Sequence, residues 1–353
     1  MSTETIQTDI TRLFKIQHPI LLAGMNNVAG PKLAAAVTNA GGLGVIGGVG
    51  YTPKMMRKMI KELKEELNDK NAPFGVDLLL PQVGGNARKT NYDYTKNTLP
   101  ELVDIIIEEK ASLFVSAVGV PPRWVVEKFH AAGIPVMNMI GSPKHAPKAL
   151  DVGVDIICAQ GHEGGGHTGN IATSVLIPQV VDLVKGRKSE LWNIQVPVIA
   201  AGGIFDGRGL AMSLSLGAQA VWVGTRFVNS EEAVCSERVK QEVIKCKAEG
   251  TMRTLIFTGR PLRIIKNPYI EDFEENRQNE IKELCSKGIL PYENDVSTGR
   301  LSQKDAIEVR PILIGQAAGA IKDILPAKTI VHNMVNDAIA IMRQNLTLVR
   351  PAL

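Results

Sequence analysis

The chain of 353 residues contains 44% apolar and 22% charged residues and has a formal net charge of +4. These values are ordinary for a globular protein and exclude a disordered or fibrous chain. Because no cluster of lysine and arginine dominates, we expect no nucleic acid partner, and the mild positive charge favours small anionic substrates.

The four cysteines show neither a metal-binding nor a disulfide spacing; they are Cys158, Cys235, Cys246 and Cys285. We therefore expect reduced thiols, no metal site and a cytoplasmic location. No apolar run reaches the roughly 18 residues of a membrane span, and the first residues lack a basic and then apolar signal. We expect neither a membrane anchor nor secretion.

The first repeating unit begins with an apolar run at residues 19–23. A loop with Gly24 and Met25 follows, and an alanine-rich stretch at residues 31–39 then ends at two glycines. This order predicts a strand, a loop, a helix and a glycine stop, which together form one βα unit.

The same unit recurs along the chain. Several of the candidate strands are uninterrupted apolar runs, which indicates burial on both faces and parallel pairing. Strands are predicted at residues 19–23, 43–46, 74–79, 113–116, 135–139, 156–159, 198–200 and 220–223. Helices are predicted at residues 31–39, 53–67, 99–109, 122–132, 145–150, 177–185, 208–216 and 231–248. Such a series predicts an α/β fold, a closed (β/α)8 TIM barrel. A doubly wound open sheet is the alternative, but the Gly-x-Gly-x-x-Gly turn expected after its first strand is absent.

The pattern changes after Gly250. We predict a barrel over residues 1–250 and a mainly helical addition over residues 251–353, which packs across the barrel mouth. The helical stretches expected in this addition lie at residues 271–284, 312–324 and 330–342.

The loop after the sixth strand carries the strongest chemical signal. Residues 160–169 hold two histidines, one glutamate and five glycines. Glycine lets a flat or anionic ligand approach the main chain, and histidine exchanges protons near neutral pH. The pairing indicates a cofactor and a base together, with a plain turn and a solvated histidine as the alternative.

The loops after the seventh and eighth strands lie where barrels commonly hold phosphate. Gly202 and Gly203 follow the seventh strand, and Gly224 and Thr225 follow the eighth. Their backbone N–H groups, with the Thr225 hydroxyl, would form a phosphate cradle, although tight turns would also use glycine.

A cofactor ring above such a cradle would face the loops after the first, third and sixth strands. Gly24 and Met25 would provide a platform and an apolar cover, and Asp77 and Gln160 would provide partners for the polar edge of the ring.

These segments resemble the nitronate monooxygenases, formerly called 2-nitropropane dioxygenases. The agreement covers nearly the whole chain and is carried by residues 19–25, 33–44, 159–167, 198–204 and 224–227. The resemblance implies an FMN cofactor, with a set of binding residues that comprises Ala23, Gly24, Met25, Asp77, Gln160, Gly165, Gly166, Ala201, Gly202, Gly203, Gly224 and Thr225.

The resemblance further implies that His167 is the active-site histidine, which removes the α-proton of a nitroalkane or holds the nitronate. The implied substrates are small alkyl nitronates, such as propionate 3-nitronate, and nitroalkanes. With O2 as the acceptor, they would yield carbonyl compounds and nitrite.

Two other functions remain open at this point. FMN-dependent NAD(P)H reductases of enoyl thioesters or quinones look similar in these segments, and a barrel could bind a phosphorylated ligand without redox chemistry.

Glu163 is predicted either to orient His167 or to cap the next helix. A carboxylate at Asp77 would lower the flavin potential unless it is protonated or paired. The oligomeric state that we expect to test is a homodimer.

Overall fold

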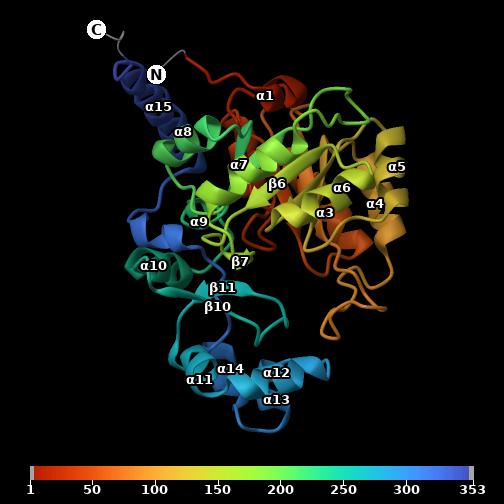
Figure 1. Cartoon of the computed structure of the whole chain (residues 1–353), viewed down its shortest axis with the longest axis vertical. Coiled ribbons are helices and arrows are strands. Elements are labelled where there is room, and N and C mark those ends of the chain that lie inside the picture. Colours follow the sequence, from red (N-terminus) through yellow and green to blue (C-terminus); the bar gives the residue numbers. More distant parts are fainter. Residues whose placement is uncertain (1–3, 350–353) are drawn as a thin grey trace.

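The computed structural model describes residues 4–349 and contains a sheet of eight parallel strands that curls into a barrel (Figure 1). The strand order is β1-β9-β8-β6-β5-β4-β3-β2, and parallel bridging of Leu21 to Leu43 joins its two edges. The predicted (β/α)8 barrel is confirmed. Its strands are β1 (Ile20–Leu22), β2 (Gly44–Gly48), β3 (Phe74–Leu79), β4 (Leu113–Ala117), β5 (Val136–Ile140), β6 (Ile156–Gln160), β8 (Val198–Ala201) and β9 (Ala220–Val223).

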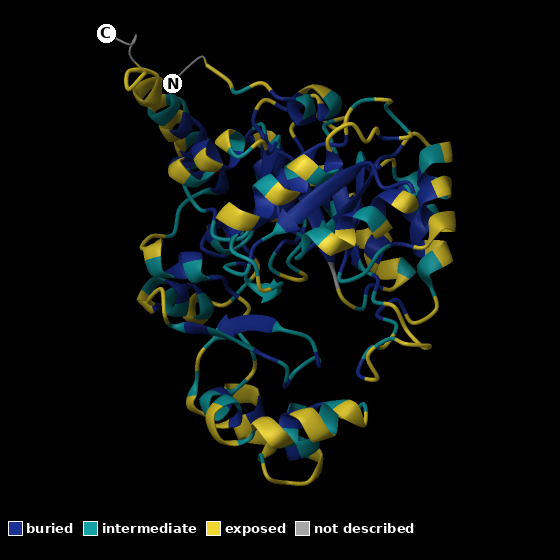
Figure 2. Cartoon of the chain, viewed as in Figure 1, coloured by how far each residue is buried: buried dark blue, intermediate teal, exposed yellow. Residues whose placement is uncertain are grey.

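Alternate residues of each strand enter two separate cores, because successive side chains of a strand point to opposite faces. Val45, Val115 and Cys158 fill the inside of the barrel, whereas Ile46 and Val76 pack against the surrounding helices. Both faces of the strands are therefore buried, as Figure 2 shows in dark blue. This double burial explains why the strands read as continuous apolar runs in the sequence.

The helices of the barrel wall match the predicted stretches closely. Proline at the first turn and a Thr52 hydroxyl that accepts from the Met55 N–H group begin α3, as expected for helix starts. The helices are α1 (Asp9–Phe14), α2 (Pro31–Asn39), α3 (Pro53–Glu66), α4 (Leu99–Glu108), α5 (Arg123–Ala131), α6 (Ala146–Asp151), α7 (Thr173–Val184) and α8 (Gly207–Ser215). The short α1 closes the barrel at the N-terminal ends of its strands with Ile10 and Phe14.

The chain after β9 contains strands that the sequence did not predict. β10 (Thr251–Thr254) and β11 (Leu262–Ile265) form an antiparallel hairpin, and β11 also pairs with β7 (Gly166–His167). This second sheet joins the addition to the loop after β6 at the barrel mouth (Figure 1). Strands of four and two residues are too short to give a recognisable alternation in the sequence.

Three helices differ from the predicted ranges, one at the end of the predicted barrel segment and two in the addition. The predicted helix at residues 231–248 is shorter, α10 (Glu237–Lys245), and residues 271–284 divide at Arg277 into α11 (Pro268–Asn276) and α12 (Gln278–Ser286). Residues 312–324 are mostly irregular and contain only the 3-10 turn η2 (Gln316–Ala320), because this segment packs its backbone directly against the loop after β6. The remaining short helices are α9 (Thr225–Val228), α13 (Pro291–Ser297) and α14 (Gln303–Glu308).

The last helix, α15 (Ala327–Leu346), returns to the barrel wall and packs along α8 and α2. A Cβ atom added to Gly207 would lie 2.4 Å from the Asp337 Cβ atom, so α8 and α15 approach very closely. Figure 1 accordingly places α15 beside α8, at the opposite end of the molecule from α11 to α14. The division at residue 250 stays a prediction, but α15 lies on the barrel flank and does not cross the mouth.

Candidate functional site

The loop between β6 and β7 is fixed on several sides. The Gln160 side chain donates from Nε2 to the His167 carbonyl at 2.8 Å. β7 pairs with β11 so that His167 faces Leu262 and Gly166 faces Arg263. Arg263 also donates from Nε to the His162 carbonyl at 2.9 Å. The position of His167 therefore depends on both the barrel and the addition.

The imidazole of His167 contacts a hydroxyl from the addition. Its Nε2 atom lies 3.1 Å from Oγ1 of Thr258. The Thr258 hydroxyl in turn donates to the carbonyl of Arg260 at 3.3 Å. A threonine hydroxyl has one proton, so this arrangement makes Nε2 of His167 the donor and leaves the lone pair on Nδ1.

Burial, together with the positive charges of Arg260 and Arg88, lowers the pKa of His167 to about 4. A neutral imidazole is therefore the dominant form at physiological pH. Such a group donates or accepts a hydrogen bond without adding charge to the site.

Glu163 caps the helix that follows the loop. Its carboxylate accepts from the Thr173 N–H group at 3.1 Å and from the Thr173 hydroxyl at 2.9 Å, at the start of α7. The carboxylate also lies 3.1 Å from Nδ1 of His162. Of the two roles left open for Glu163, the structure supports the helix cap and gives it no contact with His167.

Asp77 lies on β3 and is only 1% exposed. A Cβ atom added to Gly24 would lie 2.5 Å from Asp77 Oδ2, and one added to Gly47 would lie 2.4 Å from Asp77 Cβ. Only glycine therefore fits beside this carboxyl group on the first two strands.

The carboxyl group of Asp77 has an unused acceptor. In the part of the chain that the structure describes, its buried Oδ1 atom has no hydrogen-bond partner. Burial raises the pKa of Asp77 to about 8, so the group is mainly protonated at neutral pH and can both donate and accept, as an amide does.

The glycine-rich loops after β8 and β9 meet the loop after β6. Gly202 and Gly203 both have positive φ, 94° and 76°, and a Cβ atom on Gly202 would lie 2.8 Å from the Gly161 carbonyl oxygen. Gly224 lies beside Ala23 and Met25, since a Cβ atom there would be 3.4 Å from each side chain. Ala201, buried at the end of β8, completes this group.

A segment of the addition seals the same region. The Gly315 N–H group donates to the Thr225 hydroxyl at 2.9 Å, and the Gln316 N–H group donates to the Glu163 carbonyl at 2.9 Å. A Cβ atom on Gly165 would lie 2.6 Å from the Ile314 carbonyl carbon, so Gly165 has a clear packing role.

Most predicted site residues therefore lie around the C-terminal ends of the barrel strands. Sequence reasoning missed the groups that the addition and a long loop bring to His167, namely Thr258, Arg260 and Arg88. They lie 79 to 93 positions from His167 in the chain. Nothing in the local sequence indicates this contact, because it depends on the pairing of β11 with β7.

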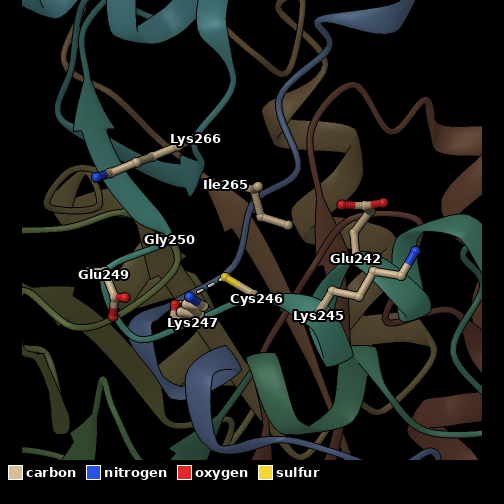
Figure 3. A pocket seen from close by; sticks show the side chains of 8 residues that line it. All are labelled: Glu242, Lys245, Cys246, Lys247, Glu249, Gly250, Ile265 and Lys266. Carbon is tan, nitrogen blue, oxygen red and sulfur yellow. Dashed lines mark hydrogen bonds between the residues drawn. The ribbon is translucent and has the colours of Figure 1, made fainter.

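Two surface hollows lie elsewhere. One of about 390 Å³ lies beside α10 and contains Cys246, whose thiol donates to the Lys247 carbonyl at 3.3 Å (Figure 3). The other, of about 550 Å³, lies near Phe14 and Trp192, at the N-terminal ends of the barrel strands. Neither is lined by a predicted site residue.

Within residues 4–349, no His, Cys, Asp and Glu side chains gather in a group of three or more that could hold a metal ion. A search of the same residues finds no helix with the length and apolar character needed to cross a membrane.

Similarity to known proteins covers nearly the whole chain. The profile of the family described as nitronate monooxygenase matches residues 7–337. A Rhodococcus jostii protein named (3aS,4S,5R,7aS)-5-hydroxy-7a-methyl-1-oxo-octahydro-1H-indene-4-carboxyl-CoA dehydrogenase is 36% identical over 272 residues, which cover 77% of this chain and 69% of that protein.

A probable nitronate monooxygenase of Staphylococcus saprophyticus is 32% identical over 302 residues, 76% of this chain and 81% of that protein. The structure of FabK from Thermotoga maritima superposes with a TM-score of 0.79 and 30% identity, over 98% of this chain and 100% of that one. The chain therefore belongs to the nitronate monooxygenase family and is an oxidoreductase of that family.

Proposed function

We propose that the protein uses FMN to oxidise alkyl nitronates with O2, which yields carbonyl compounds and nitrite. The observation that carries this proposal is the neutral imidazole of His167, with the positive charges of Arg260 and Arg88 close to it. A nitronate is an anion that already lacks its α-proton, so it needs stabilising positive charge, which the two arginines supply, more than it needs a base.

The residues at the barrel mouth fit FMN. The Asp77 Oδ1 atom is buried without a partner, and a polar edge of a flavin ring would supply one. Gly202 and Gly203 are successive residues with positive φ, a backbone conformation in which N–H groups can form the concave site that a phosphate requires. FMN supplies the redox chemistry when it is bound; the protein supplies orientation and charge.

Nδ1 of His167, which carries the lone pair, would face the substrate as a hydrogen-bond acceptor and a weak base, while the two arginines hold the anion. With a pKa of about 4, its imidazole is a weak base and would remove the proton of a neutral nitroalkane slowly. Hydrogen bonding to Thr258 fixes the ring and leaves Nδ1 facing away from that hydroxyl. We infer that preformed nitronates are better substrates than nitroalkanes.

Anaerobic stopped-flow spectroscopy of the FMN-loaded protein tests this proposal. Rapid reduction of the flavin by propyl nitronate, with none by NADH or NADPH, is the expected result. Reduction by a nicotinamide nucleotide alone would refute it.

A second candidate is an FMN-dependent oxidoreductase of a thioester, which includes the NAD(P)H reductase alternative. The Rhodococcus relative is named a dehydrogenase of a carboxyl-CoA compound, and the two arginines beside His167 suit a ligand with negative charge. In the same experiment, reduction by NADH or NADPH followed by reoxidation with an enoyl thioester or a quinone would select this candidate. Membership of an oxidoreductase family disfavours a barrel that only binds a phosphorylated ligand.

A further inference from the structure

Arg88 and Arg260 lie beside His167 without a counter-charge. Arg88 belongs to the connection between β3 and α4, and Arg260 precedes β11. Nε2 of His167 lies 3.1 Å from Oγ1 of Thr258, Arg88 donates to the Gly259 carbonyl, and Arg260 follows directly in the chain, so the three groups share one small region. Both arginines lower the pKa of His167. Among residues 4–349, no carboxylate lies within ion-pair distance of either guanidinium group.

Two other buried or partly buried arginines are paired with acids, whereas Arg263, like Arg260, has neutral acceptors. Arg226, which is 7% exposed, has Asp323 at 2.6 Å, and Arg277 has Asp295 at 2.9 Å. Arg260 is half-buried and has only neutral acceptors, so its charge is poorly compensated. A cation left in this state beside a candidate active-site residue indicates a missing anion.

The two arginines are held in place but retain free donors. Arg88 donates from Nη1 to the Gly259 carbonyl at 2.8 Å. Arg260 donates from Nε to Asn91 Oδ1 at 3.0 Å and from Nη1 to the Val118 carbonyl at 3.2 Å. Within the described part of the chain, the Nη2 group of each arginine has no acceptor. Fixed guanidinium groups with free donors are suited to bidentate binding of an oxyanion.

Other charged groups near the loop are already engaged. Glu163 binds Thr173, and Arg263 binds the His162 carbonyl and the Thr251 hydroxyl. An anion that reaches His167 would therefore meet Arg88 and Arg260 as its available partners.

We propose that Arg88 and Arg260 form a subsite for an oxyanion of the substrate, a carboxylate or phosphate carried near the reacting carbon that faces His167. This inference rests on the proposed function because it assigns the substrate a second polar group. Anion binding there would also raise the pKa of His167, because it offsets the two positive charges.

Nuclear magnetic resonance of protein with 13C-labelled histidine tests the subsite without turnover. The His167 resonance is identified with His167→Gln, and its pKa is measured at constant ionic strength with acetate, methyl phosphate or chloride. We expect a saturable rise with acetate or methyl phosphate and none with chloride. The oxyanion that saturates at lower concentration identifies the preferred group.

The variant Arg88→Met/Arg260→Met should abolish the saturable rise, whereas Arg187→Met, at an exposed arginine remote from the site, should not. If the double variant does not fold, Arg260→Lys replaces it as the test. Lysine keeps the positive charge but lacks the paired donors of a guanidinium group, and it should weaken acetate binding roughly 10-fold. An equal response to chloride, or an unchanged response in the arginine variants, would overturn the subsite.

A kinetic comparison separates the subsite from the proposed function. Arg260→Lys should raise the KM for propionate 3-nitronate about 10-fold and leave the KM for propyl nitronate nearly unchanged. Equal changes in both KM values would count against the subsite. Absence of turnover with both nitronates in the unmodified protein would refute the proposed function, and the resonance experiment would still decide the subsite.

Discussion

Nε2 of His167 lies 3.1 Å from Oγ1 of Thr258, so a residue of the barrel loop is oriented by a residue of the addition. The pairing of β7 with β11 brings the two together across 91 positions of the chain. The site is therefore complete only when the addition lies against the barrel mouth.

Replacing Thr258 with valine tests this orientation. The shape is nearly kept, but Nε2 of His167 loses its partner, and we expect kcat with propyl nitronate to fall roughly 10-fold, the effect of one lost hydrogen bond. Thr258→Ser should retain most of the activity. Flavin content, measured by absorbance, should not change in either variant; a loss of flavin would mean that Thr258 acts on cofactor binding instead.

His167→Ala should retain FMN and lose more turnover on neutral nitroalkanes than on preformed nitronates, because only the nitroalkanes need a base. Oxygen consumption with nitroethane and with its nitronate measures the difference. Negligible and equal losses on both substrates would remove His167 from the active site.

Asp77→Asn should stabilise the protein at neutral and alkaline pH. The folded pKa of Asp77 is about 8, against 3.8 for the free side chain, so between these values the folded state holds a proton that the unfolded state has released. Stability therefore falls as pH rises through this window. Asparagine cannot ionise, and the gain should grow by about 1 kcal/mol for each pH unit from pH 5 to pH 8.

Thermal unfolding at pH 5, 6.5 and 8 measures this gain, since the other ionisable groups are common to both proteins. A difference in stability that does not change with pH would show that Asp77 is not the group responsible.

Gly203→Ala tests the phosphate cradle, and Gly186→Ala is its matched control. Both glycines have nearly the same positive φ, 76° and 77°, so alanine strains the two backbones equally, by about 1 kcal/mol. At Gly186 the added Cβ atom meets nothing within 4 Å. We expect FMN affinity to fall only in Gly203→Ala, and equal affinities in equilibrium dialysis would argue against the cradle.

The barrel could be predicted from the sequence because its signals are local. The strand at residues 74–79 and the helix at residues 31–39 have the predicted bounds, since apolar runs, Pro31 and the glycine stop act on their own segments. The helix predicted at residues 312–324 was wrong over most of its length. Its apolar residues have the spacing of a helix. The backbone at Gly315, however, packs against the Glu163 carbonyl so closely that no side chain fits there.

The candidate site likewise combines residues that local sequence predicts with residues that distant segments bring to it. His167 and the glycine loops lie directly after strands, so their place in a barrel follows from their order. Arg88, Thr258 and Arg260 reach the site from distant segments, and the protonation of Asp77 depends on burial that no neighbouring residue reveals.

The return of α15 to the barrel has a consequence for synthesis of the protein. Residues 327–346 cover α8 and α2, yet they leave the ribosome after nearly all other described residues. Until then the apolar side chains of α8 that share a core with Ile330 and Met334 lack the cover of α15. The nascent chain therefore completes the barrel wall only when α15 has been synthesised. A truncated product ending near residue 326 should expose the apolar surface of α8 and α2 and aggregate.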